Sequence, residues 1–228
     1  MKEDGKTVTF APLPTIIPIP GASDGTPSVQ PGCKANLHAP PITPFKIYCA
    51  NFTSFNRAAQ NNIFTKNCQA FCGLEHHKPV SELKHIFSKK GCRVSATPPE
   101  PTSNPVLCQN NRSKGHGGEF VATLNHIDSK SLDSDIYDAI ESATNTPCRF
   151  AACIVRFKGM SILLASLYLW DSEGLSSKNN QLLTQLYILT TIIKFPFICF
   201  GDFNMPAETF QDSDWPNRPK APVFTPNV

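Results

Sequence analysis

The stretch from Phe195 to Pro206, FPFICFGDFNMP, constrains the fold of this chain more than any other segment. Residues 195–200 are almost wholly apolar, which indicates a short strand buried on both faces. Gly201 ends this expected strand, and Asp202 and Asn204 follow with one residue between them. Strand alternation places both side chains on one side, at the carboxyl end of a sheet, where ligand sites of α/β proteins gather. A carboxylate and a carboxamide there suit metal-assisted attack on a phosphate, although an ordinary polar turn has the same composition.

The part of the chain that starts near residue 44 alternates short apolar runs with helical patterns. β-branched and aromatic residues predict strands at 45–50, 69–74 and 91–96. Helices are expected at 56–67 and 79–89, between these strands. This order of strand, helix, strand, helix, strand is typical of an α/β sandwich.

The second half of the chain adds more strands and one long helix. Residues 119–125 form an expected strand, and the apolar runs 148–157 and 161–170, joined by a short Gly-containing turn, predict a hairpin. Residues 176–194 predict an amphipathic helix, because five apolar residues recur on one face. These residues are Leu182, Leu183, Leu186, Leu189 and Ile193.

The length of 228 residues fits one domain of ordinary size and a tail. Residues 1–43 carry eight prolines, interspersed with Gly, Ser and Thr. Such a composition lacks a helical or strand period, so we expect a disordered, proline-rich tail at 1–43 and the folded domain at 44–228.

Charge, hydropathy and cysteine content limit the classes of function. A net charge of +3 argues against a strongly basic, non-specific nucleic-acid coat but does not exclude a local basic groove. No apolar run approaches the roughly 20 residues of a membrane span, and the N-terminus lacks the apolar core of a signal peptide. We therefore expect an intracellular protein of the nucleus or cytoplasm, without a membrane partner, whose nine cysteines are reduced thiols.

Polar residues stand directly after several of the expected strands. If these strands are neighbours in one sheet, all of the polar residues face the same edge of it. Glu75 is a hard oxygen ligand that suits Mg²⁺, and Asn51 can complete the metal site or hydrogen-bond Glu75. Asp202 can activate the attacking water, and Tyr168 can donate its hydroxyl to a phosphate oxygen. Each residue has a plain alternative, because polar residues commonly end strands, and the interpretation depends on their agreement.

Five short motifs occur in a characteristic order between Phe45 and Asn204: FKIYCAN, FCGLEHH, GGEFVATL, ASLYLW and ICFGDFN. This order resembles the endonuclease/exonuclease/phosphatase superfamily. Within it, the chain is most similar to the endonuclease domains of LINE-type retrotransposons and their apurinic/apyrimidinic endonuclease relatives. The resemblance implies a four-layered α/β sandwich of the deoxyribonuclease type. It also implies phosphodiester hydrolysis on DNA with Mg²⁺ as cofactor, and Mn²⁺ as an alternative.

The resemblance assigns roles to the positions that match the motifs of the family. Leu74 stands where the family usually has Gln, immediately before the metal-binding Glu. The implied catalytic residues are Asp202, Asn204 and Tyr168; the implied metal ligands are Glu75 and Asn51; the implied substrate-binding residues are Asn204, Tyr168 and His77.

The chain departs from the family at its C-terminal end. The family ends in a Ser-Asp-His motif, whereas nothing after Asn204 resembles it and the last histidine is His126. We therefore expect a domain that is truncated at the C-terminus and lacks its last strands. Three functions stay open: a DNA endonuclease, for which the resemblance implies a retroelement origin; a catalytically inactive remnant that at most binds nucleic acid; and a phosphatase of the same superfamily.

Overall fold

The computed structural model describes residues 6–9, 44–52, 55–100 and 117–219, and within them the strands form two sheets. The first sheet has the order β1-β2-β3-β5-β4, and the second has the order β6-β7-β8-β9. The strands of the first sheet are β1 (Lys6–Thr9), β2 (Lys46–Asn51), β3 (Ala70–Leu74), β4 (Cys92–Ala96) and β5 (Phe120–Leu124). Those of the second are β6 (Asp128–Ser131), β7 (Phe150–Phe157), β8 (Met160–Tyr168) and β9 (Phe197–Asp202).

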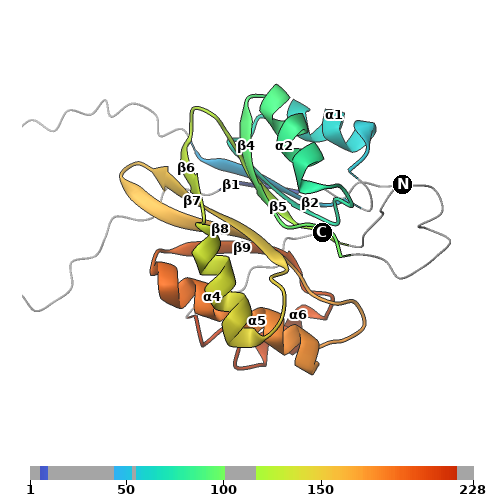
Figure 1. The fold of residues 1–228 in the computed structure, drawn as a ribbon, viewed down its shortest axis with the longest axis vertical. Coiled ribbons are helices and arrows are strands. Elements are labelled where there is room, and N and C mark those ends of the chain that lie inside the picture. Colours follow the sequence, from blue (N-terminus) through green and yellow to red (C-terminus); the bar gives the residue numbers. More distant parts are fainter. Residues whose placement is uncertain (1–5, 10–43, 53–54, 101–116, 220–228) are drawn as a thin grey trace, which may run out of the picture.

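The two sheets pack face to face, and helices cover their outer faces (Figure 1). Helices α1 (Arg57–Thr65) and α2 (Val80–Lys89) lie over the first sheet. Helices α4 (Ser134–Thr144), α5 (Ser177–Ile193) and α6 (Ala207–Gln211) lie on the side of the second sheet. The layers therefore run helix, sheet, sheet, helix, which confirms the predicted four-layered α/β sandwich.

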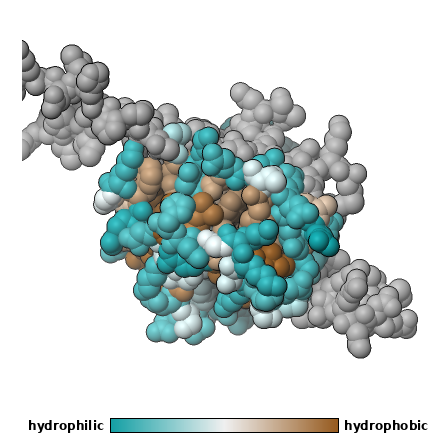
Figure 2. Space-filling view, turned by 90° about the horizontal axis from the view of Figure 1, so that it is seen from above, coloured by the Kyte–Doolittle hydropathy of each residue, from teal (hydrophilic) through white to brown (hydrophobic). Residues whose placement is uncertain are grey.

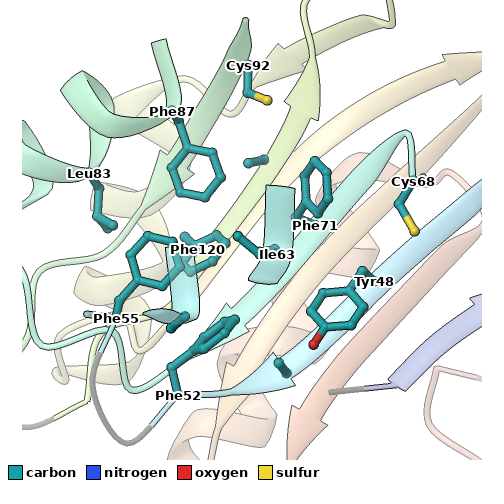
Figure 3. Close-up of a cluster of buried hydrophobic side chains, with 13 residues drawn as sticks. Tyr48, Phe52, Phe55, Ile63, Cys68, Phe71, Leu83, Phe87, Cys92 and Phe120 are labelled. Atoms are coloured by element: carbon teal, nitrogen blue, oxygen red, sulfur yellow. The ribbon is translucent and has the colours of Figure 1, made fainter. Parts of the chain in front are cut away.

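Alternating side chains of the first sheet serve two different cores. Tyr48 and Phe71 point toward α1 and α2, whereas their neighbours Ile47 and Cys72 belong to the core between the sheets. Figure 3 shows the outer core, in which aromatic side chains from β3, β5, α2 and the segment after β2 gather. Within it, the Phe55 and Phe87 rings stack at 5.8 Å and the Phe87 and Phe120 rings meet at 5.0 Å. This alternation with period two is what a sheet covered on both faces requires.

The second sheet builds the third core layer with α4 and α5. Four of the five apolar residues expected on one face of α5 are buried there, and Ile193 is partly buried beside them. The helix begins after Ser176, whose hydroxyl accepts the Asn179 backbone N–H, and it ends at Lys194 in the left-handed conformation. The predicted helix at 176–194 is thus confirmed, with its leucine face turned to the sheet.

The predicted hairpin is also present, as β7 and β8. Its turn residues Lys158 and Gly159 have φ angles of 51° and 79°. Two consecutive positive φ values match the twist of antiparallel strands, which is why a glycine at this turn favours the hairpin.

Several expectations about the strands are corrected by the structure. β9 is a half-buried edge strand of the second sheet, not a strand buried on both faces, and it continues through Gly201 to Asp202. β5 lies antiparallel between β3 and β4, so the first sheet is mixed. Two strands were not predicted: β6, and β1, which falls in the segment expected to be a disordered tail. The rest of that segment lies outside the described residues.

Surface hydropathy and the state of the cysteines can be compared with what the composition predicts. Figure 2, which views the molecule from the side of α1 and α2, shows mostly hydrophilic residues with hydrophobic ones visible between them. No helix in the described part of the chain is long and apolar enough to cross a membrane. The seven cysteines within the described ranges are free thiols, as expected.

Candidate active site

The predicted site residues stand at the ends of four strands that belong to two different sheets. Asn51 is the last residue of β2, and Glu75 follows the last residue of β3. Tyr168 ends β8, and Asp202 ends β9. β2 is parallel to β3 and β8 is parallel to β9, so within each pair the carboxyl ends lie at one edge. The strands are therefore not neighbours in one sheet, and the site residues come from two pairs of parallel strands, one pair in each sheet.

A hydrogen bond between side chains joins the two halves of the site. The Asn51 Nδ2 group donates to Asp202 Oδ2 at 3.0 Å, although 151 residues separate the two in sequence. The other carboxylate oxygen, Oδ1, accepts the backbone N–H of Asn204 at 3.1 Å. Both oxygens of Asp202 thus have a donor that fixes the orientation of the carboxylate.

Tyr168 is the second link between the sheets. Burial raises the pKa of its hydroxyl to about 12, and the charge of the nearby Glu75 adds to the rise, while hydrogen bonding with Asn204 opposes it. Glu75 comes from the first sheet and Asn204 from the second, so the Tyr168 hydroxyl lies where the two meet. With a pKa of about 12, the hydroxyl is protonated at neutral pH and can serve as a donor; in this structure it hydrogen-bonds the Glu75 carboxylate.

The backbone at two of these residues is left-handed. Glu75 has a φ of 55° and Asn204 a φ of 49°. This conformation is uncommon outside glycine, and for Glu it persists only where the surroundings enforce it. After Glu75, the backbone N–H groups of His76 and His77 donate to Gly118 and Gly117, both at 3.2 Å. Asn204 is held by its side chain, which donates to the carbonyl of Leu169 at 2.6 Å. Sites that hold unusual backbone geometry in this way are commonly functional.

The two adjacent histidines behave differently. His76 is fully buried: its Nδ1 accepts the Lys78 backbone N–H at 3.0 Å, and its Nε2 lies 3.0 Å from the Thr97 carbonyl oxygen. Since Nδ1 accepts, the proton is on Nε2 and is donated to Thr97. Burial lowers the pKa of His76 to about 4, so the ring is neutral at pH 7. His76 is a structural residue of the loop, and His77 is half-buried on the same loop; its role in substrate binding stays a prediction.

The donor set suits a hard divalent cation bound by few protein ligands. Among the described residues, no group of three or more His, Cys, Asp or Glu side chains is arranged to hold a metal ion. The half-buried carboxylate of Glu75 and the exposed amide of Asn51 stand at the ends of neighbouring parallel strands, with Asn51 in register with Leu74. Mg²⁺ usually takes only one or two carboxylates from a protein and keeps several waters. The residues present therefore fit Mg²⁺ better than a soft transition metal.

Behind Tyr168 lies a cluster of buried charge that the sequence did not point to. Glu119, at 1% exposure, accepts the Thr97 hydroxyl at 2.5 Å, and burial raises its pKa to about 7 despite the neighbouring Arg149. Arg149 is also buried, and its guanidinium carbon lies 3.7 Å from the centre of the Trp170 ring. Each of these residues looks ordinary in the sequence, and only the packing of the two sheets brings them together.

The loop after β8 is fixed by another residue that the sequence did not single out. Asn179, fully buried on α5, accepts the Trp170 backbone N–H at 2.7 Å and donates to the carbonyls of Trp170 and Gly174 at 3.1 and 2.7 Å. The Asn179 amide thereby makes the hydrogen bonds to the loop backbone that a neighbouring strand would otherwise make. The helix thus positions the segment that follows Tyr168.

Solved structures with a similar fold include several enzymes. The human Nocturnin catalytic domain has a TM-score of 0.48 and 18% identity, over 67% of this chain and 58% of that one. The endonuclease domain of TRAS1, a telomere-specific non-LTR retrotransposon, has a TM-score of 0.46 and 16% identity, over 72% of this chain and 61% of that one. ANGEL2, a 2',3'-cyclic phosphatase, has a TM-score of 0.44 and 12% identity, over 65% of this chain and 43% of that one.

The two sheets with their covering helices form the four-layered α/β sandwich that the motif resemblance predicts. The sequence itself matches no described protein family, and a search of curated proteins finds no similar sequence. This chain spans about six tenths of the length of the first two neighbours. A likeness of this degree concerns the fold, and the chemistry of the site rests on this chain's own residues.

Proposed function

We propose that this protein is a divalent-metal-dependent phosphodiester hydrolase that acts on DNA. One observation carries the proposal: five polar residues from the ends of four strands, in two sheets, gather at one edge and contact one another. These residues are Asn51, Glu75, Tyr168, Asp202 and Asn204. Polar residues that merely end strands have no reason to meet across two sheets, or to hold left-handed backbone while doing so.

Each member of this group has a role that its contacts support. Asp202 is the base that takes a proton from the attacking water, and the donors on its two oxygens hold it in one orientation. Tyr168 donates its hydroxyl to a phosphoryl oxygen, because its raised pKa keeps it protonated. Asn204 donates to the Leu169 carbonyl and hydrogen-bonds the Tyr168 hydroxyl, so it positions the group that contacts the phosphate.

Glu75, with Asn51, would hold the metal ion. Since the Asn51 amide nitrogen donates to Asp202, its carbonyl oxygen is directed elsewhere and can act as a ligand. A divalent cation bound there supplies positive charge that stabilises the charge developing on the phosphate. We assign the cation as Mg²⁺, with Mn²⁺ as the alternative, because the donors are oxygen atoms.

The test is nicking of supercoiled plasmid by the purified protein, with Mg²⁺ and with EDTA. We expect Mg²⁺-dependent nicking, and a fall of roughly 10²- to 10⁴-fold for Asp202→Ala, the range for loss of a general base. Asp212→Ala is the matched control, because it removes the same charge from an exposed position at the end of α6. It should nick like the wild type.

The other outcomes separate the alternatives. A folded wild-type protein that does not nick the plasmid, but binds it, would contradict the enzyme proposal and indicate an inactive remnant. Release of phosphate from small phosphomonoesters without nicking would indicate a phosphatase. Equal loss of activity in Asp212→Ala and Asp202→Ala would show that the effect is one of net charge, and not of the site.

A further inference from the structure

A buried arginine stands directly behind the site. Arg149 precedes β7, and because Phe150 pairs with Leu167, Arg149 lies opposite Tyr168 at the end of the β7–β8 ladder. Its guanidinium carbon lies 5.5 Å from the centre of the Tyr168 ring and 3.7 Å from that of Trp170. Tyr168 and Trp170 are two residues apart in extended chain, so one cation faces both rings.

Charge and close packing hold the guanidinium in place more than hydrogen bonds do. Arg149 Nε lies 3.4 Å from the carboxylate of Glu100, and the buried carboxyl of Glu119 is close enough for the charge of Arg149 to lower its pKa against the effect of burial. Arg149 Nη2 lies 2.8 Å from the position that a β-carbon at Gly117 would occupy. The Arg149 Nη1 group is buried without a hydrogen-bond partner in the described part of the chain.

Stability alone does not account for a cation at this place. Burying a guanidinium with incomplete hydrogen bonding costs free energy, and well-packed apolar residues often replace a buried charge without loss. Yet the side chain is almost fully buried, and its guanidinium lies over two aromatic rings, of which one belongs to the site. A planar guanidinium can pack against two rings at once, which an ammonium group cannot do in the same way.

We propose that Arg149 is a positioning residue that holds the ring of Tyr168, so that the tyrosine hydroxyl stays beside Glu75 and Asn204. This proposal rests on the proposed function only because that function gives Tyr168 a part in catalysis. Arg149 itself is buried behind the ring and acts through Tyr168. Trp170 completes the arrangement as the second face on which the guanidinium packs.

The experiment follows the Tyr168 ring by NMR at neutral pH and needs no catalysis. In the wild type we expect nuclear Overhauser effects between the Tyr168 ring protons and the Asn204 side-chain amide. They should be lost in both Arg149→Met and Arg149→Lys, since neither replacement keeps the planar guanidinium. Arg156→Met is the matched control: Arg156 lies on the same strand, β7, and is exposed in an ion pair with Asp128. This variant should keep the wild-type contacts.

Each other outcome would overturn the proposal. Contacts that persist in Arg149→Lys but not in Arg149→Met would show that charge alone matters. Contacts that persist in both folded variants, with only a lower melting temperature, would show that Arg149 serves the fold and not the position of Tyr168. If the Arg149 variants do not fold, Trp170→Leu tests the same idea, because it removes the second ring and leaves the arginine. Unchanged contacts in that variant would contradict the proposal.

A kinetic test applies if the plasmid is nicked. When Arg149 acts through Tyr168, the double variant Tyr168→Phe/Arg149→Lys should be no slower than Tyr168→Phe alone. Independent, multiplying losses would contradict a positioning role. A wild type without nicking would contradict the proposed function, and the NMR result would still decide the role of Arg149.

Discussion

At the scale of single residues, the site and its surroundings depend on groups whose chemistry is set by burial. Tyr168 stays protonated because it is buried beside a carboxylate, and His76 stays neutral because it is buried between two backbone groups. Glu119 changes its charge closest to neutral pH, because burial raises its pKa to about 7. The stability of the protein should therefore depend on pH through both buried groups, Glu119 and His76, which act in opposite directions.

We expect the contribution of Glu119 to stability to fall as the pH rises from about 4.5 to about 7, while the contribution of His76, whose folded-state pKa is lowered from 6.5 to about 4, rises between about pH 4 and 6.5. The folded-state pKa of Glu119 is raised from 4.5, so the unfolded chain releases this proton at a lower pH than the folded chain does. Above pH 7 the loss from this group reaches its full size, on the order of 3 kcal/mol. Glu119→Gln, which cannot ionise, should remove this part of the pH dependence in urea unfolding followed from pH 4.5 to 8. The exposed Glu208→Gln should leave it in place, and equal slopes in all three proteins would contradict the prediction.

At the scale of elements, a turn with left-handed backbone just before β5 holds the loop that follows Glu75. Gly117 and Gly118 have φ angles of 78° and 88°, and their carbonyls accept the N–H groups that follow Glu75. A β-carbon at Gly118 would lie 2.5 Å from His76 Nε2. Two separate constraints, conformation and close contact, thus require glycine here.

Two alanine variants separate these constraints. Gly159→Ala, in the β7–β8 turn, meets no atom within 4 Å and carries only the conformational cost of its φ of 79°. We expect it to lower the free energy of unfolding by about 1–2 kcal/mol. Gly118→Ala adds the clash with the buried His76 ring and should cost at least about 2 kcal/mol more, in line with overpacked cores. Chemical denaturation of both variants measures the difference in the free energy of unfolding. Equal losses would show that the His76 loop moves away from the added methyl group without loss of stability.

At the scale of the whole molecule, the site exists only while the two sheets stay packed. Asn51 and Glu75 come from one sheet, and Tyr168, Asp202 and Asn204 come from the other. The core between the sheets includes Leu164, Cys72 and Val121, and the Ser166 hydroxyl donates to the Gly73 carbonyl across it at 3.2 Å. A change in this middle layer should therefore reach the site, whereas an equal change in an outer layer should not.

Two leucine variants compare the middle layer with an outer one. Leu164, between the sheets, and Leu189, between α5 and the second sheet, are exposed by 1% and 0%. Each Leu→Ala change should cost about 2–5 kcal/mol. At equal folded fraction, Leu164→Ala should nick plasmid more slowly than Leu189→Ala, because it shifts one half of the site against the other. Equal rates per folded molecule would show that the halves are not coupled through the middle layer.

Much of the fold and part of the site followed from the sequence alone. Runs of β-branched and aromatic residues indicated seven of the nine strands in the described part of the chain, and helical periodicity indicated α5 with its leucine face. The positions of Asn51, Glu75, Tyr168, Asp202 and Asn204 at strand ends could also be predicted, because strand termination is a local property. Strand β6 could not, since the sequence DSKS has no apolar residue and pairs only because β7 offers an edge.

Tertiary structure decided how these local elements meet. Local patterns do not state which strand pairs with which, and so the sequence left open that β5 enters between β3 and β4 and that the site is shared by two sheets. The buried charges of Glu119 and Arg149 are a second case, because burial and pairing arise only when residues far apart in the chain pack together. The sequence determined which chemical groups end the strands. Packing of the sheets determined which of those groups touch, because contacts over long sequence separations depend on the whole fold.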